Sequence, residues 1–432
     1  MGLVRAGTLT LASRVGVFIL SLASGVILAR ALGPNGRGIY ALALLAPSVL
    51  VLVANLGVSN ALVYHLARRT YPFDTVIGQV ISLALLLGVG AMAVLVGVSH
   101  FFGHVLLPGV SEQLILMAGA AIPLSLFFYF CLSFTQGVQA FWAFNSLYMV
   151  NAAALLVLLA FLVVAPRSVT VAVAAWTLSW VPTALLGLYW LSRWGRLNAR
   201  FDWHVSRALL RFGIVGYLSF LTNYFNLRLD TFLVNIFKNA TQVGFYAVAV
   251  GLAETIWYIS TSAATVLAPR VAAGESTESD ESTAQVCRVV FATSILAALL
   301  LGVTAPVIIR ILFGSGFAPS VTAVWLLLPG VVTLSVARVL SSYLLGRNRQ
   351  VVDLVASLAG VVGTLALDLL LIPRFGFAGA AAASSVAYTV TLAVNLTWVV
   401  RNSTLTAGDL LMPRPADFRV MLRRLPLPAW LR

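Results

Sequence analysis

Charge is scarce in this chain. Charged residues make up 9% of its 432 positions, and hydrophobic residues make up 61%. A soluble protein of this size needs more charge than that to cover its surface, so the soluble globular class is excluded. Cysteine is rare as well: Cys131 and Cys287 are the only two, and both fall in or at the edge of apolar runs. They exclude a disulfide framework and show no metal-ligand spacing.

What the sequence does contain is long apolar runs. Many reach about 20 residues or more, the length at which an α-helix crosses ~30 Å of hydrocarbon. The strands of an outer-membrane barrel would be only ~10 residues long and would alternate strictly. We therefore predict an all-α, polytopic membrane protein. Its twelve predicted transmembrane spans lie at about 9–31, 38–65, 76–99, 113–137, 143–165, 169–192, 212–237, 243–268, 286–311, 319–344, 350–372 and 376–400.

The few charged residues are mostly basic, 27 against 13 acidic, and the net charge is +14. In a soluble protein this excess would indicate nucleic acid, but here the basic residues flank the spans. With a cytoplasmic amino terminus, 18 of them lie in cytoplasmic loops or tails, six on the opposite side and three within spans. The positive-inside rule thus predicts an inner-membrane protein with both termini in the cytoplasm and no nucleic-acid partner.

The two halves of the sequence repeat one another. The hexapeptide GIYALA at 38–43 returns as GFYAVA at 244–249, an offset of 206. Two further anchors recur at offsets of 209 and 207: Gly137 with Gly346, and Pro166 with Pro373. A six-helix repeat begins and ends on one side of the membrane, so we expect a pseudo-twofold axis along the membrane normal. We expect the small residues of the hexapeptides to pack the second helix of each copy against the first.

The repeat predicts how the chain is organised. An N-terminal six-helix lobe covers 1–195, a basic cytoplasmic connector 196–211, a C-terminal six-helix lobe 212–400, and a basic cytoplasmic tail 401–432. Two such lobes suit transport by alternating access. The acidic segment GESTESDEST at 274–283 is rich in small residues, which is typical of a mobile, solvated linker; a cation site is the alternative.

Several segments resemble a known family in their order and spacing. They are ILARALGPNGRGIYALALLAPSVLVLVANLGVSNALVYHLAR at 27–68, RLDTFLVNIFKNATQVGFYAVA at 228–249, LFGSGFAPS at 312–320 and LLIPRFGFAGAAAASSVAYTV at 370–390. They resemble the polysaccharide transporters, which are lipid-linked oligosaccharide flippases. These belong to the multidrug/oligosaccharidyl-lipid/polysaccharide exporter superfamily.

The resemblance implies a function. A flippase of this family moves an undecaprenyl-diphosphate-linked oligosaccharide from the cytoplasmic to the outer leaflet for surface polysaccharide biosynthesis. Membrane lipids, and a polysaccharide polymerase or glycosyltransferases, would be its other partners. Two alternatives stay open: an ion-coupled multidrug or small-solute antiporter of the same superfamily, and a non-transporting membrane scaffold for polysaccharide synthases.

Ionisable residues inside spans are costly in a bilayer, so they usually line a cavity or pair with one another. Arg228 is the candidate contact for a diphosphate, because the guanidinium fork matches phosphate oxygens; a structural ion pair is the alternative. Asp230 lies about 200° from Arg228 around a helix, so the two cannot face the same way. We expect Asp230 to pair structurally with a neighbouring helix, and Glu254 either to bind a coupling H+ or Na+ or to pair with Arg228.

Two more residues are candidates for the substrate. Arg14, one turn from the cytoplasmic end of its span, either receives the incoming diphosphate or snorkels to the interface. Asn55 either contacts sugar hydroxyls or forms an interhelical hydrogen bond. Arg338 is expected to snorkel, and Asp368 has no assigned partner. The sequence shows no nucleophile motif, catalytic dyad or metal-ligand set, so we predict neither an enzyme nor a cofactor beyond a coupling ion.

Overall fold

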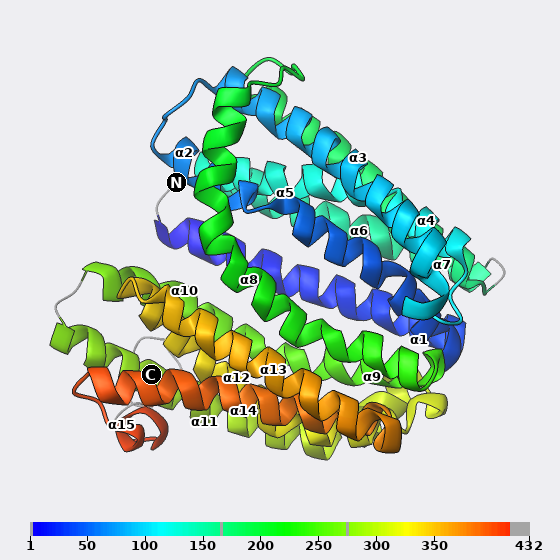
Figure 1. Cartoon of the computed structure of the whole chain (residues 1–432), viewed down its shortest axis with the longest axis vertical. Coiled ribbons are helices and arrows are strands. Elements are labelled where there is room, and N and C mark those ends of the chain that lie inside the picture. The colour runs from blue at the N-terminus through cyan, green and yellow to red at the C-terminus, as the bar shows by residue number, and fades with distance from the viewer. Residues whose placement is uncertain (1–2, 165–166, 274–275, 415–432) are drawn as a thin grey trace, which may run out of the picture. The chain divides into compact units, whose positions relative to one another are not determined.

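The computed structural model describes residues 3–164, 167–273 and 276–414, and within these ranges the chain forms helices and no strand (Figure 1). Ten helices in the described ranges are long and apolar enough to cross a membrane. The all-α, polytopic prediction is confirmed. Residues 415–432 of the predicted tail lie outside the described part of the chain.

The count of twelve spans is not confirmed, and two helices account for the difference. Helix α1 (Leu3–Asn55) contains the first two predicted spans, joined at Gly33, whose φ of 64° and ψ of −176° interrupt the helical backbone. Pro34 follows, and the helix is kinked at this point before it continues. Helix α8 (Trp203–Phe237) contains the seventh predicted span but is not among the ten. Its intramembrane charges and asparagines make it more polar than the ten helices that qualify as membrane spans.

The chain divides into two compact units, and the first contains residues 1–221, 234–247 and 312–316. In it, α1 packs against α6 and α7, and α5 packs against α2, α3 and α7. The bounds are α2 (Val58–Ala67), α3 (Phe73–Leu106), α4 (Glu112–Gly119), α5 (Ile122–Gly137), α6 (Phe141–Val164) and α7 (Val169–Ser192).

A break in the second predicted span lets α8 come close. The backbone leaves the helix at Leu56 and Gly57, whose φ angles are 48° and 77°. A Cβ on Gly57 would lie 2.3 Å from the carbonyl oxygen of Gly213, so only glycine fits this crossing. The Tyr217 hydroxyl donates to the Leu52 carbonyl at 2.8 Å and satisfies part of the opened backbone.

The two hexapeptides of the repeat meet one another within this first unit. A Cβ on Gly38 would lie 1.7 Å from the carbonyl oxygen of Ala240, and a Cβ on Gly244 would lie 2.0 Å from that of Pro34. The second glycine belongs to α9 (Ala240–Ala253). Tyr40 and Ala43 of the first hexapeptide lie in one buried cluster with Leu28 of the first predicted span, as expected for packing within that copy. The glycines add a contact that was not expected, because they allow α1 and α9 to touch.

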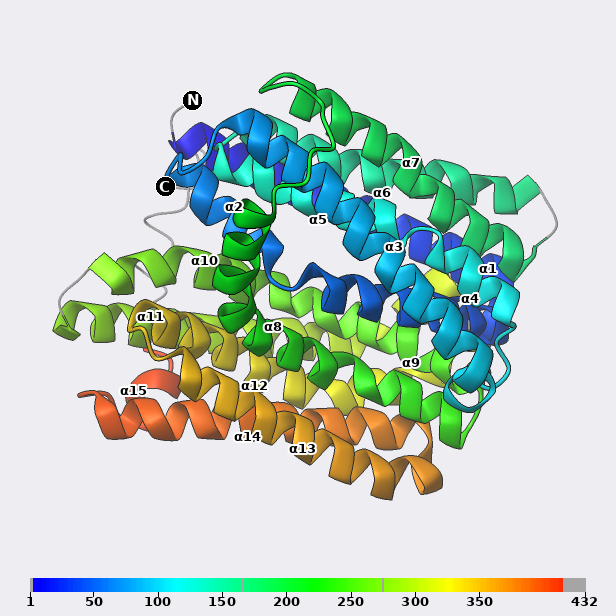
Figure 2. The same cartoon turned by 45° about the horizontal axis from the view of Figure 1, so that its top comes forward.

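The second unit contains residues 222–233, 248–311 and 317–432. Helix α12 is at its centre and packs against α10, α11 and α14, while α13 pairs with α14 (Figures 1 and 2). Its elements are the 3-10 turn η1 (Glu254–Ile256), α10 (Trp257–Ala273), α11 (Ser276–Ile308), the π segment η2 (Ile309–Phe313), η3 (Ser315–Phe317), α12 (Ser320–Gly346), α13 (Gln350–Phe375), α14 (Phe377–Asn402) and α15 (Ala407–Leu411). The predicted lobe boundaries stay a prediction.

The acidic segment 274–283 is not a linker over the part that the structure describes, because α11 begins at Ser276. Asp280 is 4% exposed and accepts hydrogen bonds from the Tyr343 hydroxyl at 2.7 Å and from Arg347 at 3.0 Å. Thr404 donates to its second oxygen at 3.4 Å. The expectation of a solvated linker was wrong, since this carboxylate connects α11 with the end of α12 and with the segment between α14 and α15.

Candidate functional site

An arginine–carboxylate pair lies where α9 gives way to α10. Arg228 of α8 contacts Glu254 with both terminal nitrogens, at 3.1 Å and 3.3 Å from the two carboxylate oxygens. Glu254 opens the 3-10 turn η1, which interrupts the span and lets its side chain reach α8. The two side chains are 31% and 26% exposed, so the pair is fixed in place but still accessible.

A second arginine joins this pair. The guanidinium of Arg338, on α12, lies over the Trp257 ring at 4.2 Å from its centroid and donates to the Thr261 hydroxyl at 3.4 Å. Its charge also interacts with Glu254. The expectation that Arg338 snorkels is replaced by this contact with the α10 aromatic ring. Glu254 thus forms an ion pair with Arg228, while Arg338 interacts with it electrostatically and contacts Trp257 and Thr261. We call Arg228, Arg338 and Glu254 the arginine cluster; its formal charge is positive.

Two buried carboxylates form a separate site on the other side of α8. Asp230 is 0% exposed and accepts a hydrogen bond from Ser384 at 3.0 Å and from the amide of Thr231 at 2.7 Å. Asp368 of α13 is also 0% exposed and interacts electrostatically with Asp230. Neither of its carboxylate oxygens has a hydrogen-bond partner among the described residues. We call these two residues the aspartate pair.

Polar groups of neighbouring helices surround the aspartate pair. The Thr364 hydroxyl donates to the Asn226 side-chain oxygen at 2.7 Å, one turn before each aspartate on α13 and α8. A Cβ on Gly360 would lie 2.8 Å from the Asn226 amide nitrogen, so the small residue makes room for it. Burial near a second carboxylate disfavours two negative charges at this site, because like charges repel strongly away from water. No cluster of three His, Cys, Asp or Glu side chains occurs in the described ranges.

The geometry expected for α8 is confirmed, because Arg228 and Asp230 reach different neighbours. Of the two readings of Glu254, the pairing with Arg228 is what the structure shows, and its coupling role stays a prediction. The diphosphate role of Arg228 also stays a prediction. Asp230 accepts hydrogen bonds from neighbouring groups, as a structural role requires, yet it also belongs to the aspartate pair.

The remaining candidates belong to the first unit. Arg14 is exposed, and its guanidinium lies over the Tyr148 ring of α6 at 4.7 Å from the centroid. Asn55 is 5% exposed and closes the break before α2: its amide donates to the Ser59 hydroxyl at 2.8 Å, and its oxygen accepts from the Ser59 amide at 3.4 Å. Both substrate roles stay predictions, although Asn55 already has a local partner.

The sequence did not reveal those residues of the arginine cluster and of the aspartate pair that come from distant helices. Trp257 gives no signal in the sequence, because aromatic residues abound in membrane helices. Asp368 was visible as an intramembrane acid, which is a functional signal in itself, but nothing in the sequence linked it with Asp230. The link depends on the packing of α8 against the α13–α14 pair.

The helices and the charged groups inside them define a polytopic membrane protein with a transporter fold. The solved structure described as "Lipid II flippase MurJ, inward closed conformation" matches with a TM-score of 0.79 and 14% identity, over 98% of this chain and 94% of that one. An inward-facing MATE-family multidrug transporter of the MOP superfamily matches with a TM-score of 0.75 and 16% identity, over 89% of this chain and 94% of that one. A MOP-superfamily transporter from Pyrococcus furiosus, described as having a binding pocket of reverse polarity, matches with a TM-score of 0.66 and 16% identity, over 92% of this chain and 94% of that one.

The sequence itself identifies the family. The profile of the family described as "Polysaccharide biosynthesis protein" matches residues 3–275, more than half of the chain, so this protein belongs to that family. No curated protein sequence matches significantly. The predicted resemblance to a polysaccharide family is confirmed, and the structural neighbours named above are described as a flippase and transporters.

Proposed function

We propose that this protein is a flippase that moves an undecaprenyl-diphosphate-linked oligosaccharide from the cytoplasmic to the outer leaflet by alternating access. The observation that carries the proposal is the arginine cluster of Arg228, Arg338 and Glu254. A diphosphate head needs cationic donors with fork geometry in a partly dry site, and two guanidinium groups near a single carboxylate, of which only Arg228 is ion-paired with it, supply a net positive charge. Family membership supports a role in polysaccharide biosynthesis.

The partial exposure of the pair supports binding as well as structure. Full burial of an ion pair carries a desolvation cost, whereas 31% of the Arg228 side chain remains accessible and can meet a ligand. Binding a phosphate would draw Arg228 partly from Glu254, so substrate and carboxylate compete for the same donors. Arg14, exposed on α1, is the further donor that we assign to the incoming diphosphate.

A coupling ion completes the proposal. The aspartate pair supplies carboxylate oxygens next to the Ser384 hydroxyl and the Asn226–Thr364 contact, a set that suits either a proton or Na+. The same acidic site favours the second candidate function, an ion-coupled antiporter of a small organic cation. The two candidates differ in which charged cluster meets the substrate.

Complementation of a deletion strain tests the proposal. Cells without the protein are expected to accumulate undecaprenyl-linked sugar in the inner leaflet, and the native gene is expected to clear it. Arg228→Ala and Arg338→Ala should fail to clear it, whereas Arg207→Ala, an exposed arginine near the start of the same α8, should succeed. Unchanged lipid-linked intermediates in the deletion strain, together with lost resistance to organic cations, would favour the antiporter instead.

A further inference from the structure

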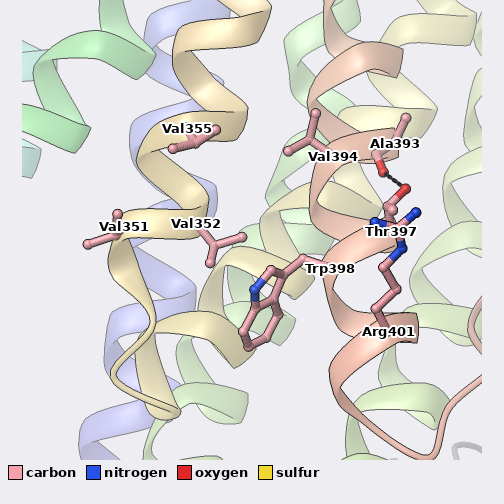
Figure 3. Close-up of a pocket in the computed structure, with 8 residues that line it drawn as sticks. All are labelled: Val351, Val352, Val355, Ala393, Val394, Thr397, Trp398 and Arg401. Atoms are coloured by element: carbon pink, nitrogen blue, oxygen red, sulfur yellow. Dashed lines mark hydrogen bonds between the residues drawn. The ribbon is translucent and has the colours of Figure 1, made fainter.

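A groove runs between α13 and α14 of the second unit, at the end remote from their connecting turn. It has a volume of about 510 Å³ and lies between Val351, Val352 and Val355 of α13 and Val394, Trp398 and Arg401 of α14 (Figure 3). Val351 is 72% and Val355 53% exposed, so the apolar side of the groove is open. The lining of α14 from 393 to 401 covers about 12 Å of helix at 1.5 Å per residue.

The groove has a cationic end. Arg401 is exposed and forms no ion pair with any residue in the described ranges. Figure 3 shows its guanidinium beside Thr397, one turn back along α14 rather than beyond the helix end. Arg349, which is exposed at the N-cap of α13, adds a second positive charge two residues before Val351. The predicted topology places this end of both helices at the cytoplasmic leaflet.

The combination selects the kind of ligand. Valines along the helix axes suit an aliphatic chain, because they offer apolar surface without polar groups to satisfy. An unpaired guanidinium at the membrane edge suits a phosphate, and an indole such as that of Trp398 is typical of the headgroup level. We propose that this groove binds one anionic phospholipid of the cytoplasmic leaflet, with an acyl chain against the valines and its phosphate on Arg401.

A phospholipid fits better than the lipid-linked substrate. The groove is only about 12 Å long, too short to enclose a long polyprenyl chain. Arg401 is the one arginine in the groove lining itself, and Arg349 lies beyond it at the start of α13, whereas the diphosphate proposed above has the two arginines of the arginine cluster. The groove also faces outward between two helices, at exposed positions such as Val351, where annular lipid is present at bulk concentration. The proposal thus concerns a site distinct from that of the transported molecule.

Native mass spectrometry of the full-length protein in detergent tests the proposal with phosphatidylglycerol as the probe. We expect one tightly held lipid, bound at least about fivefold more weakly by Arg401→Gln and by Val355→Trp, which fills the groove, and retained by Arg401→Lys. The matched controls are Arg374→Gln, at the far end of α13, and Val362→Trp, a 66% exposed position on α13 outside the groove. Both controls are expected to bind as the native chain does. Melting temperatures confirm that each variant is folded.

Three outcomes would overturn the proposal. One is equal binding by the native chain, Arg401→Gln and Val355→Trp. Another is equal binding of phosphatidylcholine, which would show that the negative headgroup is irrelevant. The third is displacement of phosphatidylglycerol by equimolar undecaprenyl phosphate, which would assign the groove to the polyprenyl lipid.

Discussion

Gly38 and Gly244 contact each other reciprocally across the internal repeat. A Cβ on Gly38 would lie 2.9 Å from the amide nitrogen of Gly244, and one on Gly244 would lie 3.2 Å from that of Gly38. A neighbouring pair of equivalent residues is also in contact. The Thr241 hydroxyl donates to the Asn35 side-chain oxygen at 3.4 Å, and these two residues are likewise 206 positions apart. Equivalent residues of two copies meet only on or near an axis that relates them. The contact therefore supports the pseudo-twofold relation of the repeat.

Alanine at either glycine is expected to destabilise the protein. The atoms that a new Cβ would strike are backbone, which cannot rotate away, so the cost is that of overpacking, about 1–3 kcal/mol. Gly25→Ala on α1 and Gly251→Ala on α9 are the controls, since a Cβ at either meets nothing within 4 Å. Thermal unfolding in detergent measures the difference. Equal melting temperatures for Gly244→Ala and Gly251→Ala would show that the contact does not constrain the fold.

A disulfide across the same contact is expected to stop transport. The predicted topology places Asn35 and Thr241 at the outer face, where alternating access requires the two copies to part. The double substitution Asn35→Cys with Thr241→Cys should cross-link on oxidation, arrest flipping, and regain it on reduction. The natural Cys131 and Cys287 are buried and serve as an unreacted background. Flipping that continues at full rate in the cross-linked protein would mean that this contact stays closed throughout the cycle.

Exchanging the charges of Arg228 and Glu254 separates structure from function. Arg228→Ala alone should lower the free energy of unfolding, because it leaves a partly buried carboxylate unpaired; loss of one partner from a fully buried pair costs about 3–5 kcal/mol. The double variant Arg228→Glu with Glu254→Arg should recover much of that stability while flipping remains lost, since the cation has moved from α8 to η1. Recovery of flipping together with stability would reduce the pair to a structural role.

The sequence predicted the helical class and the location of most spans, because apolar length and polar breaks are local properties. It offered the pairing of Glu254 with Arg228 as one of two alternatives and could not choose between this pairing and a coupling role, because the choice depends on the contact between α8 and η1. Nor could it predict the aspartate pair, whose members lie on α8 and α13. The sequence shows the sign of each charge and its position along a span. It does not show which charges come into contact, because that depends on how the helices pack.

The error at 274–283 has a related cause. Small and acidic residues usually indicate a solvated segment, and this composition outweighed the helix-forming tendency of its glutamates. The composition gives no sign that Asp280 forms an ion pair with Arg347, whose terminal nitrogen lies 3.0 Å from the Asp280 carboxylate. A tertiary ion pair of this kind leaves no local pattern.

Asp280→Ala is expected to be strongly destabilising for that reason. The carboxylate is nearly buried and accepts hydrogen bonds from Tyr343, Arg347 and Thr404, so its removal leaves several donors without their acceptor, at a cost of about 3–5 kcal/mol. Its neighbour Glu281 is exposed, and Glu281→Ala should be close to neutral. Chemical denaturation followed by tryptophan fluorescence compares the two. Equal midpoints would mean that the Asp280 contacts contribute no net stability.

The aspartate pair makes the last prediction, which concerns the coupling ion. A ligand that binds only the folded protein stabilises it by about 2.7 kcal/mol at a hundredfold excess over its dissociation constant. If Na+ lies between Asp230 and Asp368, sodium chloride should raise the melting temperature more than choline chloride does; if a proton does, the melting temperature should depend on pH and not on the cation. In either case Asp368→Asn should abolish the response of the melting temperature, because the amide removes one of the two charges that require an ion.

The control is Asp353→Asn, in the first turn of the same helix. It should lower the melting temperature itself but keep its response to the ion, since Asp353 accepts hydrogen bonds from Ser341 and Asn395 instead. A response that survives Asp368→Asn would move the coupling site to another intramembrane acid, of which Glu254 is the first to test.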